Sequence, residues 1–387
     1  MKILIIFIDM IRPNRLSTFN SNIKKDTPLD HSLKKLGGTF YTQCFSVAPD
    51  TPRGMAAFAT GQLPYQNGCD SRVKWPRYFL NEDKDSLYHL FADKGYALTF
   101  FSNPNERETG MFPESISKMD IHNHDYDLDG YLSKVKLQKN HFVFISLPDF
   151  HWSFDDNSYT TFGEQQAYHD VQKSYDVIFK NFKKDDFDHI FVFSDHGFKF
   201  FHEFKRQPQY FLLNEDRTNI LMIHRQKNDK NNIVYNDKLC AITDIYPSIQ
   251  QLLGEQQITG LPLLSSQSQD EIIIEDHLEF SPTVNQNLGI WAVIRTDEIY
   301  IRTLAQGYCL NRHSREIIEK INQKDDELLK QKSDFSKYIN EYEKVFSYRK
   351  FIFKQTLYMY GGKRKKITKL LKYFYSIKDF IFQRLKP

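Results

Sequence analysis

The sequence of 387 residues contains only four cysteines, and none of them forms a closely spaced pair. Cys44, Cys69, Cys240 and Cys309 are scattered, with neither a CxxC motif nor the spacing of a zinc site. This pattern argues against a disulfide-rich secreted scaffold and against a cysteine-based zinc domain. It is typical of reduced thiols in a cytoplasmic protein.

Long apolar runs are missing as well. The first apolar run, Ile3–Ile8, is shorter than the core of a signal peptide and is ended by Asp9. No stretch approaches the roughly 20 apolar residues that cross a bilayer. We therefore expect a cytoplasmic protein, which would act at a membrane only from its surface.

Neither sign of charge dominates the chain, whose formal net charge is +3. The distribution is uneven, because nine of the 52 basic residues but only one of the 49 acidic residues lie between Lys363 and Lys386. The rest of the chain is therefore acidic by about five charges. An acidic body without a known nucleic-acid-binding module argues against nucleic acid as a partner.

The basic C-terminal segment also carries an apolar stripe. Apolar residues recur at steps of three and four, at Ile367, Leu370, Leu371, Phe374 and Ile377, among the lysines and arginines. This pattern predicts an amphipathic helix of the kind that lies on anionic membranes. The alternative is a helix whose stripe docks on the body of the protein.

The sequence from its start to about residue 254 alternates between strand-like and helix-like segments. Apolar runs predict strands at 2–9, 96–101, 141–147, 188–193 and 219–224. Helices are predicted over 27–36, 85–94, 165–182 and 243–253, most of them followed by glycine. This alternation predicts an α/β fold, with a mostly parallel central sheet between two layers of helices. Further along, 291–301 predicts a strand of a small second sheet, and 315–345 predicts a charged helix.

Acids and histidines follow three of the predicted strands. Asp9 ends the first, Asp149 and His151 follow the third, and Asp195 and His196 follow the fourth; His202 comes soon after. A single residue of this kind is usually structural. Because the carboxyl ends of parallel strands meet at one edge of a sheet, their repetition there predicts a metal site. Carboxylates and neutral imidazoles suit zinc or manganese.

The segment Val47–Gly61 places a hydroxyl, Thr51, between two prolines at the start of a predicted helix. The first turn of a helix presents unpaired backbone N–H groups and favours an anion. Thr51 could therefore attack a phosphate or sulfate bound there. The alternative is that Thr51 only caps the helix, the usual role of threonine at this place. Arg53 is either a phosphate contact or a surface arginine.

The order of these segments resembles that of the sulfatase-like branch of the alkaline phosphatase superfamily. The matching segments, in the family's order, are Phe7–Asp9, Thr27–Gly37, Ala48–Gly68, Leu87–Tyr96, Ser194–Gly197 and Thr243–Gly254. The resemblance implies an alkaline phosphatase-like three-layer sandwich over residues 1–290. A small C-terminal subdomain would follow at 291–345, and the basic tail at 346–387.

The chain departs from sulfatases at the nucleophile. Sulfatases carry a cysteine or serine that matures to formylglycine, whereas counting back from Thr60-Gly61 places Thr51 at this position. Threonine there resembles the phosphodiesterase, phosphoethanolamine-transferase and lipoteichoic-acid-synthase members. By resemblance, Asp9, Asp195 and His196 would hold a first divalent ion together with Thr51. Asp149, His151 and His202 would hold a second ion or bind the substrate anion.

We therefore expect a phosphotransferase or phosphodiesterase that depends on one or two divalent ions (zinc, manganese, calcium or magnesium), with Thr51, Arg53 and His151 as catalytic residues. The expected substrate is a cell-envelope glycan or lipid-linked phosphodiester, with transfer of the phosphoglycerol or phosphoethanolamine type. The tail would hold the enzyme on the inner membrane face. The alternatives are a sulfatase-like hydrolase that works without formylglycine, and an inactive family member that serves as a scaffold in envelope assembly.

Overall fold

The computed structural model describes residues 1–67, 69, 80, 86–102, 112–113, 116, 127–157, 160–198, 213, 215–276, 290–302, 306–312 and 317–322. The predicted tail at 346–387, most of the predicted helix at 315–345, and His202 lie outside these residues. Within the part of the chain that is described, no helix is long and apolar enough to span a membrane.

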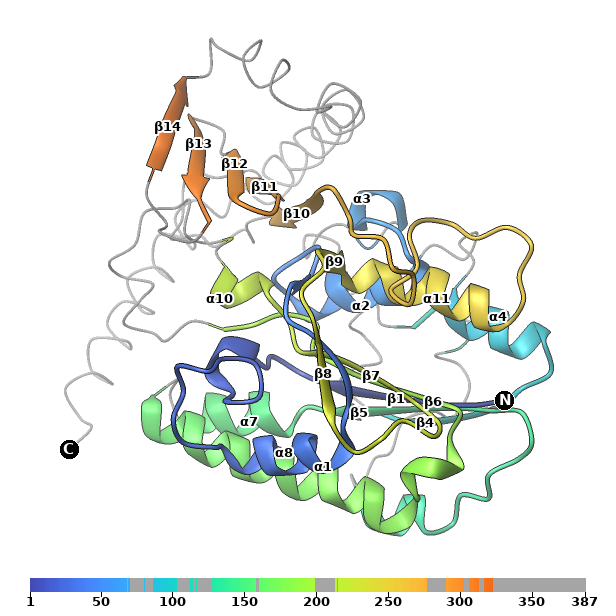
Figure 1. Cartoon of the computed structure of the whole chain (residues 1–387). Coiled ribbons are helices and arrows are strands. Elements are labelled where there is room, and N and C mark those ends of the chain that lie inside the picture. The colour runs from blue at the N-terminus through green and yellow to red at the C-terminus, as the bar shows by residue number, and fades with distance from the viewer. Residues whose placement is uncertain are drawn as a thin grey trace, which may run out of the picture.

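A seven-stranded sheet forms the centre of the molecule (Figure 1). Its strand order is β4 (Ala97–Phe101), β5 (His141–Leu147), β1 (Lys2–Ile8), β6 (His189–Phe193), β7 (Met222–Gln226), β2 (Gly38–Tyr41) and β8 (Ile233–Asn236). Every neighbouring pair is parallel except the two that include β7. The predicted mostly parallel sheet is thus confirmed.

Helices cover both faces of this sheet (Figure 1). One layer contains α2 (Thr51–Thr60), α3 (Pro64–Asn67), α4 (Leu87–Asp93) and α11 (Ile245–Leu252); the other contains α1 (Pro28–Leu36), α6 (Leu128–Leu132), α7 (Asp149–Asp156) and α8 (Thr161–Asn181). Because side chains alternate between the two faces along a strand, β1 contributes side chains to the cores under both helix layers. Ile3, Ile5 and Phe7 pack in the core that includes α2, whereas Leu4, Ile6 and Ile8 pack in the core that includes α8.

The remaining elements before the second sheet are short. They are η1 (Pro13–Arg15), η4 (Lys184–Asp186), η6 (Ile242–Asp244), α10 (Glu215–Thr218), and the parallel pair β3 (Cys44–Phe45) and β9 (Cys240–Ala241). Helix α7 was not expected, because the sequence after β5 reads only as the end of a strand. It begins directly after Pro148, and it carries both Asp149 and His151.

The ends of α1 and α2 show why the sequence marks these helices clearly. Thr27 and Asp30 form a reciprocal capping box at the start of α1, and Gly37 follows its end with φ 67°. Asp50 caps α2, and Gly61 ends it in the left-handed conformation with φ 66°. Cap and stop residues therefore fix both boundaries close to those predicted.

A second sheet has five antiparallel strands: β10 (Ile272–Asp276), β11 (Ile290–Ile294), β12 (Glu298–Arg302), β13 (Gln306–Asn311) and β14 (Ile317–Asn322). The single strand predicted at 291–301 was wrong, because a turn closed by the Arg295 N–H and the Glu298 carbonyl makes it a hairpin. The start of the helix predicted at 315–345 is also wrong. Pairing of β14 with β13 outweighs the charged, helix-like pattern there.

The second sheet contacts the main body beside the segment that leads to Thr51. The N–H of Glu275 in β10 donates to the Val47 carbonyl at 2.8 Å. Arg312 pairs with Glu215 and Gln43, and its guanidinium lies 4.8 Å from the centroid of the Phe45 ring. Strand β10 precedes the predicted domain boundary at 290/291 but belongs to this sheet.

Candidate active site

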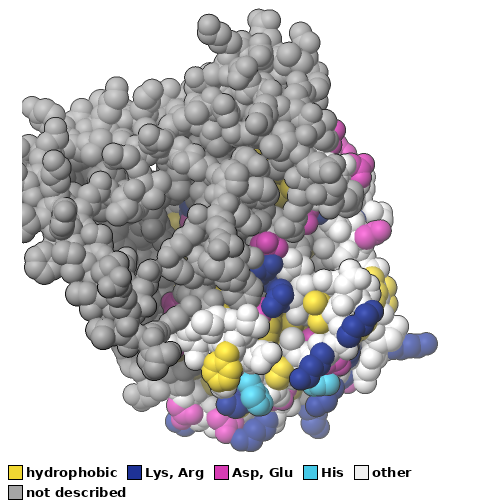
Figure 2. All heavy atoms as spheres, turned by 90° about the vertical axis from the view of Figure 1, so that its left-hand side faces the viewer, with side chains coloured by type: hydrophobic (Ala, Val, Ile, Leu, Met, Phe, Trp, Pro, Cys, Tyr) yellow, Lys and Arg dark blue, Asp and Glu magenta, His cyan; other side chains and the backbone are white. Residues whose placement is uncertain are grey.

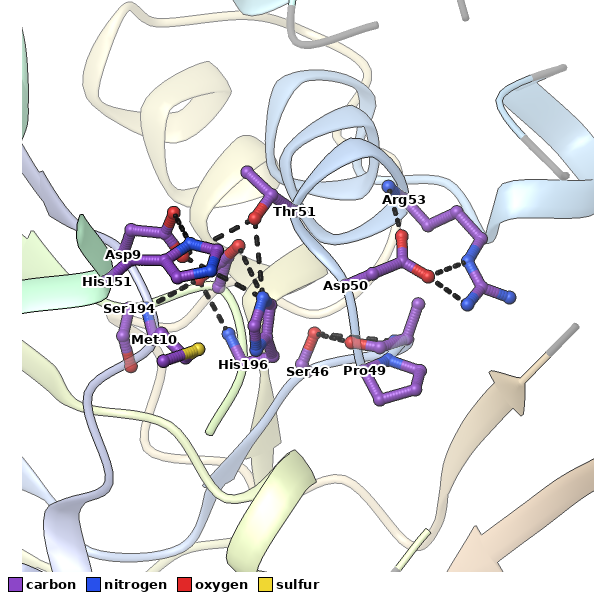
Figure 3. Close-up of polar contacts among 12 residues, drawn as sticks. Asp9, Met10, Ser46, Pro49, Asp50, Thr51, Arg53, His151, Ser194 and His196 are labelled. Carbon is purple, nitrogen blue, oxygen red and sulfur yellow. Dashed lines mark hydrogen bonds and ion pairs between the residues drawn. The ribbon is translucent and has the colours of Figure 1, made fainter. Parts of the chain in front are cut away.

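Four predicted site residues meet at the carboxyl edge of the central sheet (Figure 3). Asp9 follows β1, Asp195 and His196 follow β6, and Thr51 is the first residue of α2. The Thr51 Oγ1 lies 3.4 Å from Asp9 Oδ1 and 3.3 Å from His196 Nε2. The side chains point toward one another from three separate segments of the chain, so the fold alone assembles this group.

Asp9, Asp195 and His196 could together hold a metal ion. All three are buried, and one potential ligand atom from each lies within 4.8 Å of the others. No other group of three acids, histidines or cysteines among the described residues has its ligand atoms as close together. We call it the Asp9–Asp195–His196 group.

Two atoms of the Asp9–Asp195–His196 group are placed as ligands of a cation would be. The Asp195 Oδ1 accepts N–H groups from Met10 (3.2 Å) and His196 (2.9 Å), whereas its buried Oδ2 accepts no hydrogen bond from any residue that the structure describes. The His196 Nδ1 lies 2.7 Å from the Gly197 carbonyl oxygen. In the neutral imidazole Nδ1 donates there, which leaves the lone pair of Nε2 on the side of Asp195 and Thr51. A divalent ion would satisfy both atoms.

The charges in the site are strongly perturbed. Burial, with the charge of Asp9 added to it, raises the pKa of Asp195 to about 6, against the opposing effect of His196. Burial would also raise the pKa of Asp9, but the charge and hydrogen bond of His151 outweigh it, and the pKa of Asp9 is lowered. The charge of Asp9 in turn raises the pKa of His151 to about 11. His151 is therefore the cation that offsets Asp9 when no metal ion is bound.

Met10 and Gly54 shape the backbone around the group. Met10 has φ 69°, a strained value for a residue with a side chain, and this turn directs its N–H to Asp195. Gly54 lets α2 approach the Asp195 loop closely. A Cβ at Gly54 would lie 3.1 Å from the Asp195 carbonyl oxygen and 3.3 Å from the Ser46 Oγ.

The start of α2 offers fewer donors to an anion than the sequence predicts. Pro52 has no N–H, and Arg53 donates its N–H to the Asp50 side chain at 3.2 Å. Of the first three residues of α2, at most Thr51 keeps its N–H for a ligand. Asp50, and not Thr51, is the N-cap, so the capping role that was the alternative for Thr51 is filled by its neighbour.

Three predicted site residues lie apart from the Asp9–Asp195–His196 group or outside the described chain. The buried Arg53 pairs with Asp50 through both Nε (2.6 Å) and Nη2, on the far side of Thr51 from His151 (Figure 3). Asp149 accepts a hydrogen bond from Ser174 of α8 at 2.7 Å. His202 lies outside the described residues. Their proposed roles toward a phosphate or a second ion remain predictions.

His151 reaches the site from α7. Its Nδ1 lies 2.8 Å from Asp9 Oδ2, and its Nε2 lies 3.4 Å from Asp155 one turn further along the helix. The sequence analysis missed Asp155, although its spacing of four from His151 would have indicated it had α7 been predicted. It also missed Met10, for which the sequence offers no signal.

The sequence matches no known protein-family model, and no curated protein matches it. Solved structures do match. The structure is similar to a 2-O GAG sulfatase (TM-score 0.64, 14% identity, 88% of this chain and 92% of that one). It is also similar to the phosphonate monoester hydrolase of Agrobacterium radiobacter (TM-score 0.57, 12% identity, 90% and 96%). A third similar structure is that of a protein in the alkaline phosphatase superfamily from Vibrio parahaemolyticus (TM-score 0.55, 15% identity, 82% of this chain and 81% of that one). The chain thus has the alkaline phosphatase-like fold that the resemblance predicted.

Proposed function

We propose that this chain is a metal-dependent phosphotransferase or phosphodiesterase whose nucleophile is Thr51. The observation that carries the proposal is the position of the Thr51 Oγ1, 3.3 Å from His196 Nε2 and 3.4 Å from Asp9 Oδ1. A hydroxyl that only capped a helix would have no reason to face a buried group of two carboxylates and an imidazole. The alkaline phosphatase-like fold, shared with hydrolases of sulfate and phosphonate esters, supports the same class of reaction.

A divalent ion held by Asp9, Asp195 and His196 would lower the pKa of the Thr51 hydroxyl and offset negative charge on the substrate. Thr51 would lose its proton and form an Oγ1–phosphorus bond, while the bond from phosphorus to the first alcohol breaks and that alcohol takes up a proton. An acceptor hydroxyl or water would then attack phosphorus and give up its proton, the Oγ1–phosphorus bond would break, and Thr51 would take up a proton to recover its hydroxyl. His151, held on Asp9, would supply positive charge beside the transferred group.

Phosphorus is favoured over sulfur by the chemistry of Thr51. A sulfatase releases sulfate from a hydrated aldehyde, which an ordinary alcohol cannot form. A phosphoryl group on threonine can instead be displaced by an acceptor. The complete Asp9–Asp195–His196 group, with its unsatisfied Asp195 Oδ2, also favours an enzyme over an inactive scaffold.

We further propose that the substrate is a cell-envelope glycan or lipid-linked phosphodiester at the inner membrane face, with transfer of the phosphoglycerol or phosphoethanolamine type. The basic, amphipathic sequence of the C-terminal tail supports this location. On the described part of the face in Figure 2, Lys and Arg side chains lie among Asp, Glu and His side chains, so the proposed attraction to an anionic surface depends on the tail.

Two model esters and a metal analysis test the reaction class. Purified full-length protein should retain a divalent ion by elemental analysis and should hydrolyse bis(4-nitrophenyl) phosphate faster than 4-nitrophenyl sulfate. A chelator should abolish the activity, and Thr51→Ser should keep part of it. Faster turnover of the sulfate ester would overturn the assignment to phosphorus. A protein that turns over neither ester and retains no metal would favour the scaffold.

A further inference from the structure

Helix α7 carries a pair of side chains, His151 and Asp155, that extends the site toward solvent. Asp155 Oδ2 lies 3.4 Å from His151 Nε2, and the other ring nitrogen of His151 lies 2.8 Å from Asp9 Oδ2. The exposed fraction of the side chain rises along this row, from 11% for Asp9 to 31% for His151 and 47% for Asp155. The row therefore runs from the buried group to the surface.

The rotation of α7 about its axis is fixed by contacts on its other faces. Asp149 accepts a hydrogen bond from Ser174, and Ser153 donates to Asp170 at 2.9 Å, so both residues hold α7 on α8. Phe150 and Phe154 are fully buried below. With these faces held, residues 151 and 155 are left on the side of Asp9. The ring of His151 is 31% exposed, and its contacts in this row are those with Asp9 and Asp155.

The two oxygens of Asp9 have different partners. Oδ1 faces Thr51 Oγ1 (3.4 Å) and His196 Nε2 (3.8 Å), whereas Oδ2 faces His151. A carboxylate held through one oxygen presents the other in a fixed direction. An imidazole held at only one nitrogen can rotate and release its partner, so the second contact of His151 decides how firmly Asp9 is held.

We infer that Asp155 is a positioning residue, which fixes the ring of His151 on Asp9 Oδ2 and so aims Asp9 Oδ1 at a metal ion beside Thr51. The inference rests on the proposed function in one respect, that the Asp9–Asp195–His196 group binds a divalent ion. It gives Asp155 a role that acts through its contact with His151. It also assigns His151 to the support of a ligand, beside its proposed effect on the substrate.

Calorimetric titration of the chelator-treated full-length protein with Mn²⁺ tests this role without any substrate. Asp155→Asn should weaken Mn²⁺ binding by about three- to tenfold, less than the 10–100-fold typical of a residue that touches a ligand directly. Asp155→Glu should restore part of the loss, because a longer carboxylate on the same helical face can still reach His151. The matched control is Asp156→Asn, which removes the same charge from the next, exposed position of α7.

A double-mutant cycle separates positioning from a general effect of charge. In a His151→Gln background, Asp155→Asn should have no further effect on Mn²⁺ affinity. Equal losses for Asp155→Asn and Asp156→Asn, or an undiminished loss in the His151→Gln background, would overturn the inference while leaving the proposed function intact. A wild-type protein that binds no Mn²⁺ or Zn²⁺ would overturn both.

Discussion

Replacing Asp195 with asparagine should stabilise the metal-free protein and weaken metal binding at the same time. Asp195 has no exposed surface, and its Oδ2 accepts no hydrogen bond from the described residues. Burial is the main reason that its pKa is raised to about 6. At pH 7.5 the metal-free protein therefore holds an ionised carboxylate in an unfavourable environment, which a bound cation would relieve.

The size of the effect follows from the pKa of Asp195. A rise from 3.8 to about 6 corresponds to roughly 3 kcal/mol of lost stability once the group is ionised. Asparagine keeps the oxygen that accepts the Met10 and His196 N–H groups, but its buried amide needs a partner, so we expect a net gain of about 1–2 kcal/mol. The penalty is fully present above pH 6 and disappears as the pH falls toward 3.8. The gain should therefore shrink between pH 7.5 and pH 5.

Urea unfolding of chelator-treated protein at both pH values measures the stability, and titration with Mn²⁺ measures the affinity. Loss of a ligand should weaken Mn²⁺ binding by about 100-fold or more. Asp244→Asn is the matched control, because burial also raises the pKa of Asp244 to about 6, but this residue lies outside the Asp9–Asp195–His196 group. An unchanged Mn²⁺ affinity in Asp195→Asn, or a metal-free variant less stable than wild type at pH 7.5, would refute the reasoning.

Three further predictions concern the rest of the molecule. Burial and the neighbouring His189 lower the pKa of His224 to about 3, so this base stays neutral in the fold. Acidification from pH 7 to pH 5 should lower the free energy of unfolding by about 2 kcal/mol through His224. The free energy of unfolding in urea should therefore depend less on pH in His224→Gln, whereas the exposed His169→Gln should not reduce this dependence. Phe58→Ala should lose about 3–5 kcal/mol of unfolding free energy, because Phe58 is fully buried and its ring centroid lies 4.6 Å from that of Phe193. Full-length protein should co-sediment with anionic liposomes, less so in high salt, and deletion of residues 361–387 should release it with activity on a soluble ester retained. An insoluble truncated protein would instead indicate a tail that docks on the body.

Much of the central fold could be predicted because its signals are local. The apolar runs of β1, β5 and β6 read as buried strands, and Thr27, Gly37 and Gly61 mark helix ends that the structure keeps. A metal site at the carboxyl edge followed from one rule of topology, that parallel strands end at a common edge, and the resemblance then selected Asp9, Asp195 and His196 from the acids and histidines there. Thr51 followed from the resemblance, through its spacing to Thr60-Gly61.

What could not be predicted depends on contacts between distant segments. The direction of β7 and the hairpin of β11 and β12 are set by pairing, which a single strand pattern does not reveal. Arg53 reads as an available cation, but Asp50, three residues earlier, binds it. Asp149 and His151 read as equivalent, but the rotation of α7 sends one to α8 and the other to Asp9.

The central claim, that Thr51 attacks phosphorus, is tested most directly by the mass of the protein during turnover. Metal-loaded wild type, Thr51→Ser and Thr51→Ala proteins would be mixed with a phosphodiester donor, quenched in acid, and examined by intact-mass spectrometry and peptide mapping. We expect a mass increase equal to the transferred group on the peptide that contains Thr51. The Thr51→Ser protein should carry the same adduct on the new serine, and the Thr51→Ala protein should carry none and show no turnover. An adduct on another residue, or a Thr51→Ala protein that turns over the donor at the wild-type rate, would contradict the account.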